Sequence, residues 1–73
     1  MITNEELQNL TLEQLLSEIP ILKIENRVGM LTVTTKFHLV NKQIEITQET
    51  KINNYIDDLK SLLIRCYLDV RKI

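Results

Sequence analysis

A two-residue period in the apolar side chains dominates the middle of this chain of 73 residues. Apolar residues alternate with Thr, Lys, Glu, Gln and His in the segments 22–26, 30–40 and 43–48. Because successive side chains of a strand point to opposite faces of a sheet, the alternation predicts three strands with one apolar and one polar face. The β-branched residues and Phe37 in these segments also favour strands.

The connections between the three segments are short, as in antiparallel hairpins. The first is "NRVG", residues 26–29, where Gly29 can adopt a positive φ. The second is the two-residue turn Asn41-Lys42. These turns predict a three-stranded antiparallel meander with its apolar side chains on one face. The expected cross-strand pairs are Ile24 with Leu31, Leu22 with Val33, Leu39 with Ile44, Phe37 with Ile46, and His38 with Glu45.

Helical signals precede the strands. Capping-box sequences, T-x-x-E and T-x-x-Q, begin at Thr3 and Thr11, and Pro20 ends the second helical pattern. We therefore expect an N-terminal arm or short helix within residues 1–10 and a second helix at 12–19. This region is acidic, because residues 1–20 hold four glutamates and no Lys or Arg.

A longer helical pattern follows the strands. From Ile52 to Ile73 the apolar residues are spaced alternately four and three positions apart, as on one face of a helix. Thr50 is a suitable N-cap, so the pattern predicts one long helix over residues 50–73. Its apolar stripe is expected to cover the apolar face of the sheet.

The expected fold is therefore a single small α+β domain, residues 1–73, in the order α-β-β-β-α. Helices cover one face of the sheet, and the other face stays open and polar, which antiparallel sheets tolerate. The residues expected on the open face include Lys23, Thr32, Thr34, Lys36, His38 and Glu45.

Part of the last helix is apolar outside its main stripe, at Ile64 and Leu68. One interpretation is that Ile64 contacts the neighbouring short helix and Leu68 is simply exposed. In the other, a helix of about 36 Å overhangs strands of about 20–33 Å, and its free end binds a second copy of the chain. The candidate interface residues are Ile64, Tyr67 and Leu68, with Ile2, Leu7 and Leu10 on the N-terminal arm.

The residues present argue against an enzyme. With one Gly, the chain has neither a Walker A loop nor a G-x-G-x-x-G motif. One Cys and one His do not supply the four ligands of a usual zinc site. Cys66 is expected in the core and His38 on the opposite face of the sheet, so they do not form a nucleophile–base pair. We expect no catalytic residues, no cofactor and no metal.

Nucleic-acid binding is the alternative to protein binding. The order α-β-β-β-α resembles that of double-stranded RNA-binding domains, whose second helix begins with a lysine-rich run. The corresponding segment here, "ETKINNYIDD", offers only Lys51, and the net charge is −1. A nucleic-acid-associated regulator would instead use the open sheet face with Lys23, Lys36 and Lys42.

The remaining features suggest where such a protein acts. No apolar run approaches the roughly 20 residues that cross a membrane, and "MITNEEL" lacks the features of a signal peptide. Ala is missing and Gly and Pro occur once each, which suggests an AT-rich genome such as those of many phages. We expect a small phage or mobile-element regulator or inhibitor, dimeric and cytoplasmic, that binds a host protein; a small assembly subunit is a further alternative.

Overall fold

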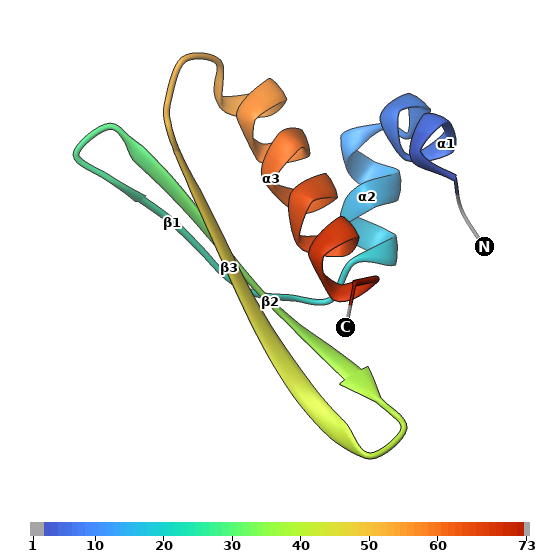
Figure 1. The fold of residues 1–73 in the computed structure, drawn as a ribbon. Coiled ribbons are helices and arrows are strands. Elements are labelled where there is room, and N and C mark those ends of the chain that lie inside the picture. The colour runs from blue at the N-terminus through green and yellow to red at the C-terminus, as the bar shows by residue number, and fades with distance from the viewer. Residues whose placement is uncertain (1–2, 73) are drawn as a thin grey trace.

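The computed structural model describes residues 3–72 and confirms the α+β fold in the order expected (Figure 1). Its three strands form one antiparallel sheet in the order β1-β2-β3. The elements are α1 (Asn4–Asn9), α2 (Leu12–Glu18), β1 (Ile21–Arg27), β2 (Met30–Leu39), β3 (Lys42–Lys51) and α3 (Tyr55–Val70).

The two N-terminal helices begin where the capping sequences predict. The Thr3 side chain accepts a hydrogen bond of 3.2 Å from the backbone N–H of Glu6 at the start of α1. At the start of α2, Thr11 and Gln14 make the reciprocal pair of a capping box, at 3.2 and 2.9 Å. These bonds satisfy N–H groups that have no partner within a helix. The N-terminal arm is therefore a short helix.

The sheet pairs its strands two residues away from the expected register in both hairpins. Its turns are Val28-Gly29 and Val40-Asn41, not the loops expected from the sequence. The observed pairs are Ile24 with Val33, Asn26 with Leu31, Phe37 with Ile44, His38 with Gln43, and Lys36 with Glu45. All five expected pairs, including His38 with Glu45, are wrong. A shift of two residues preserves which face each side chain occupies, so most of the faces are assigned correctly. Two assignments are wrong: Lys42 stands opposite Leu39 on the helix-facing side and not on the open face, and a bulge interrupts the alternation at Leu22.

The C-terminal helix is shorter than expected because β3 continues through the segment where the helix was placed. Asn54, not Thr50, caps α3, and its side chain accepts from the N–H of Asp57 at 3.2 Å. A helix of 16 residues is about 24 Å long, whereas the ten residues of β2 span about 33 Å. The sheet therefore extends past the helix, the reverse of the expected overhang, as Figure 1 shows.

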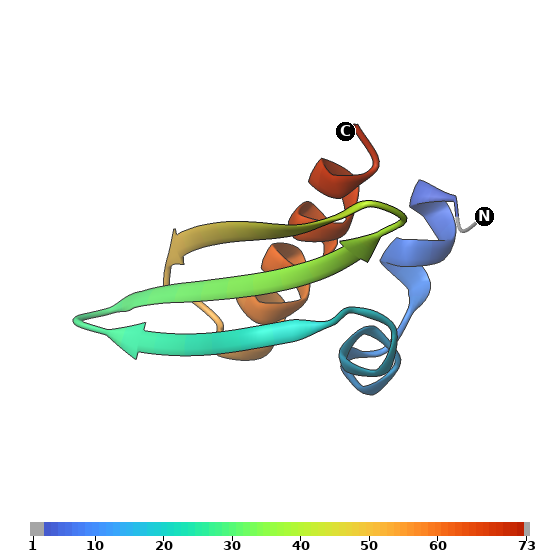
Figure 2. The same ribbon diagram turned by 90° about the horizontal axis from the view of Figure 1, so that it is seen from below.

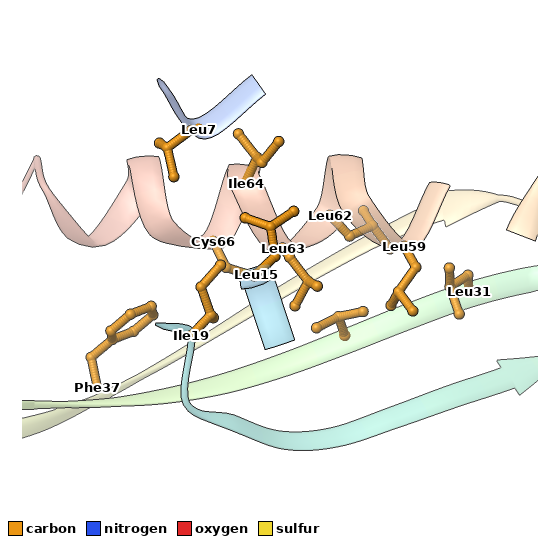
Figure 3. Close-up of a cluster of buried hydrophobic side chains, with 11 residues drawn as sticks. Leu7, Leu15, Ile19, Leu31, Phe37, Leu59, Leu62, Leu63, Ile64 and Cys66 are labelled. Atoms are coloured by element: carbon orange, nitrogen blue, oxygen red, sulfur yellow. The ribbon is translucent and has the colours of Figure 1, made fainter. Parts of the chain in front are cut away.

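The hydrophobic core lies between the helices and one face of the sheet (Figure 3). Helix α3 packs mainly on β2 and β3, and α2 packs on α3. The buried apolar residues are Leu7, Leu15, Ile19, Leu31, Val33, Phe37, Leu59, Leu62, Leu63, Ile64 and Cys66. The opposite face is open and polar, and there the hydroxyl groups of Thr34 and Thr47 lie 3.2 Å apart.

Candidate protein-interaction surface

The second apolar face of α3 is covered by α1. Leu7 of α1 and Ile64 of α3 are 1% and 7% exposed, and Figure 3 shows the two side chains side by side. Both belong to the core of this chain, so in this structure neither is available to a partner. The prediction that Leu7 and Ile64 offer a free interface is therefore wrong for this conformation.

The other predicted interface residues are less deeply placed. Leu10, Tyr67 and Leu68 are partly buried and pack against the core, and the Arg71 guanidinium lies 5.3 Å from the centre of the Tyr67 ring. Ile2 lies outside the described residues. The structure thus brings the predicted α1 and α3 residues together, but as an intramolecular contact.

The largest change from the sequence-based expectation is at strand β1. Ile24 stands opposite Val33 on the helix-facing side of the sheet, yet Ile24 is 37% exposed while Val33 is fully buried. The reason is that α3 lies mainly over β2 and β3, so β1 receives little cover. Figure 2 shows β1 as one outer strand of the sheet. The apolar side chain of Ile24 is therefore partly exposed, although it lies on the face of the sheet that carries the core.

A β-bulge places a second apolar side chain on the same strand. The register shifts between Ile21 and Lys23, so Leu22 has no partner on β2 and is 54% exposed. Bulges redirect side chains in this way and are frequent at sheet edges. The sequence pattern, which assumes a regular strand, placed Leu22 opposite Val33. We call Leu22, Ile24 and the free backbone edge of Ile21–Arg27 the β1 edge.

The backbone of the β1 edge can accept another strand. Val28 and Gly29 have φ of 49° and 76°, as in a type I′ turn, and Arg27 and Met30 flank that turn. Residues that flank a two-residue hairpin turn form a hydrogen-bonded pair, and the pairs alternate along the strands. The N–H and C=O groups of Ile24 and Asn26 therefore point away from β2, toward the free edge.

Charged side chains line the open face of β1. Glu25 lies 3.2 Å from the Lys23 ammonium and 3.4 Å from Nε of Arg27. Charges of this kind often keep an edge strand from pairing indiscriminately. Alternating signs along a strand can also select one partner, because opposite charges attract across a strand pair.

His38 and Cys66, the two side chains considered for catalysis, lie on opposite faces of the sheet. His38 is exposed on the open face opposite Gln43, whereas Cys66 is fully buried on the helix side, as expected. Burial raises the pKa of the Cys66 thiol, the nearby Thr35 hydroxyl lowers it, and the Asp69 carboxylate raises it, with a net upward direction. Within residues 3–72, no three His, Cys, Asp or Glu side chains are grouped so as to hold a metal ion.

Sequence reasoning missed the polar contacts inside the domain. The Thr35 hydroxyl donates to the carbonyl of Ile46 at 3.1 Å, and the Gln48 amide donates to the Asp69 carboxylate, linking β3 to α3. The signal for Thr35 was its position between Val33 and Phe37 in the two-residue period. Its polar character kept it out of the predicted core.

Comparison with known proteins finds no family model, curated protein or solved structure that matches this chain. In the part of the chain that the structure describes, no helix has the length and apolar character needed to cross a membrane. Function therefore has to be argued from the surface itself. The β1 edge is the place where apolar side chains and free backbone groups occur together.

Proposed function

We propose that this chain is a non-enzymatic protein–protein interaction module that binds through the β1 edge. The observation that supports this most directly is the exposure of Ile24 on the helix-facing side of the sheet, opposite the fully buried Val33. Strand addition to a free sheet edge is a common way for proteins to bind, because main-chain bonds give affinity and neighbouring side chains give specificity.

The biological setting that we propose is a small phage or mobile-element regulator or inhibitor that acts on a host protein in the cytoplasm. Its support is the composition, which lacks Ala and holds one Gly and one Pro. A small module can act by occupying a surface that its target needs for another partner.

The open polar face supports a nucleic-acid role less well. Lys36 stands opposite Glu45, and the Lys23 ammonium lies 3.2 Å from Glu25, so carboxylates offset both charges. Affinity for phosphate backbones depends on uncompensated Lys and Arg. This face therefore offers a weak surface for phosphate groups.

The test is a pull-down from host lysate with the tagged protein, nuclease treatment before elution and mass spectrometry after it. Ile24→Lys places a charge on the β1 edge, whereas Val40→Lys makes the same change at the fully exposed β2–β3 turn. We expect the wild type and Val40→Lys to retain the same protein and Ile24→Lys to lose it. A protein retained equally by Ile24→Lys would contradict binding through the β1 edge, and a bait that elutes alone would contradict a host protein as the target.

A protein that leaves the bait with nuclease would favour the nucleic-acid alternative. Binding should then fall steeply with added salt, because displaced counterions dominate such association. Binding to the β1 edge should depend on salt only weakly by comparison, since apolar and main-chain contacts supply most of it.

A further inference from the structure

We infer that the partner of the β1 edge is a second copy of this chain, paired antiparallel so that Ile24 of one copy lies opposite Ile24 of the other. This inference rests on the proposed function, because it names the partner of the same surface. The surface differs from the interface on α3 that the sequence predicts. In the structure, Ile64 of that predicted interface is buried beside Leu7.

Symmetric pairing of two β1 strands uses the backbone groups that point away from β2. Two antiparallel strands related by a two-fold axis pair each residue with one whose groups also point to the free edge. On β1 these are Ile24 and Asn26, since Arg27 next to the turn bonds to β2. A pair centred on Lys23 or Glu25 would also use only outward groups, because the central residues would then form a non-hydrogen-bonded pair, so the choice among these centres depends on overlap and charge.

The overlap of the two strands favours the pairing centred on Ile24. This position is the midpoint of the seven residues of Ile21–Arg27, so the two copies of β1 overlap over their full length. Centring on Asn26 would place Ile24 opposite Val28 of the turn and shorten the contact to the end of the strand. The Ile24 pairing therefore gives the longest ladder.

The charges on the strand agree with the same register. With Ile24 at the centre, Lys23 of each copy lies opposite Glu25 of the other, which gives two opposite-charge pairs. Centring on Lys23 or on Glu25 would instead place like charges opposite each other. One arrangement thus satisfies the backbone, the overlap and the charges together.

The pairing would also cover the exposed apolar surface of β1. The two-fold axis of an antiparallel strand pair is perpendicular to the sheet, so both copies keep their helices on the same side. Ile24 would then contact Ile24 of the second copy on the helix-facing side. The product is a six-stranded sheet in which β1 is no longer an edge, a common solution to the exposure of free strand edges.

The test starts with sedimentation equilibrium of the purified wild-type protein, for which we expect about twice the monomer mass of 8.6 kDa. Ile24→Pro removes an N–H that points away from β2, so the hairpin of the monomer should survive while the dimer is lost. Gln43→Pro makes the matched change on the outer edge of β3 and should remain dimeric. A wild type that stays monomeric would overturn the inference.

A charge exchange tests the register without proline. Lys23→Glu alone, or Glu25→Lys alone, places two like-charge pairs across the dimer and should weaken it about tenfold to a hundredfold. An equimolar mixture of the two variants should form a heterodimer, because both cross-strand pairs then have opposite signs again. Lys42→Glu changes the net charge by the same amount at the far hairpin and should stay dimeric. Mixed with Glu25→Lys, it should form the heterodimer more weakly than Lys23→Glu does.

The outcomes separate this inference from the proposed function. A heterodimer that forms as strongly between Lys42→Glu and Glu25→Lys would mean that net charge, not the β1 register, drives association, and would overturn the inference. A wild type that is monomeric in purified form but retains a lysate protein through Ile24 would overturn self-pairing and leave the interaction module intact. A dimer that retains no other protein would support self-pairing and contradict a foreign target.

Discussion

Thr35 is the only fully buried polar side chain among residues 3–72. Its hydroxyl donates to the Ile46 carbonyl oxygen at 3.1 Å. The Cys66 thiol donates to the same Ile46 carbonyl oxygen at 3.8 Å. A buried hydroxyl that makes its hydrogen bond avoids the cost of losing water. Thr35 therefore suits a core position that a strict apolar pattern would give to Val.

Replacing Thr35 by Val tests that hydrogen bond. The shape is nearly kept and the donor is lost, so the free energy of unfolding should fall by about 1 kcal/mol in urea titration. Thr34→Val is the matched control, because Thr34 lies on the open face next to Thr47 and should change stability by less than about 0.5 kcal/mol. Equal or greater stability of Thr35→Val would show that the hydroxyl contributes nothing.

The buried thiol of Cys66 links stability to pH. Burial, and then the Asp69 carboxylate, raise its pKa above the usual value of about 8.5. The folded state therefore holds the proton more tightly, and this contribution is fully present below the unfolded pKa and is lost as pH rises through the folded pKa. The unfolding free energy, measured from about pH 7 to pH 10, should fall more for the wild type than for Cys66→Ala. Parallel curves would contradict the assignment.

At the scale of the turns, Val28 is an unexpected residue. It has φ of 49° and is fully exposed, so a β-branched side chain occupies the left-handed region without any packing to favour it. Gly29 beside it, with φ of 76°, has open space around its missing Cβ. The turn is held by strand pairing on both sides and not by its own preferred sequence, for which Asn-Gly is typical.

Val28→Asn should therefore raise the free energy of unfolding by about 1 kcal/mol, the order of the penalty for a left-handed residue with a branched side chain. Thermal unfolding followed by circular dichroism would show this as a higher Tm. Val40→Asn is the control, because Val40 is an exposed turn residue that does not have a positive φ. A similar gain at both sites would mean that lower surface hydrophobicity, and not backbone strain, is the cause.

The same turns explain how much of the sheet the sequence predicts. The faces of β2 and β3 follow from local alternation, so Leu31, Val33 and Phe37 were correctly assigned to the core. The register depends on where each turn closes, and "NRVG" holds no signal that Val28 would adopt a positive φ. The bulge at Leu22 was equally invisible, because it reflects pairing with β2 and not a pattern within β1.

The boundary between β3 and α3 shows a second limit. Apolar spacing from Ile52 onward fits a helix, and the apolar alternation of β3 stops at Ile46 because Gln48 and Thr50 are polar. In the structure positions 44, 46, 48 and 50 are nevertheless all half-buried within β3. Hydrogen bonding to β2 decides in favour of the strand up to Lys51, and Asn54 then provides the cap. Because the helix was predicted too long, the spare apolar surface was sought on α3 and not on the sheet.

At the scale of the whole molecule, a short helix layer covers a longer sheet. Helix α3 covers β2 and β3, and α1 covers the far side of α3 through Leu7 and Ile64. The N-terminal helices therefore complete the core around α3, while β1 is left partly uncovered. The position of the interaction surface follows from this unequal coverage, which depends on element lengths in three dimensions.

This arrangement predicts opposite behaviour for two neighbouring residues of α3. Ile64→Glu buries a charge against Leu7 and should lower the free energy of unfolding by about 3 kcal/mol or more, with α1 losing protection in hydrogen exchange. Leu68→Glu changes a partly buried residue one turn away and should cost much less, because its carboxylate can reach water. Urea titration and sedimentation of both variants would compare the effects. A stable Ile64→Glu protein with an altered oligomeric state would indicate that α3 forms the interface. A destabilised protein whose folded fraction associates as the wild type does would support an interface on β1.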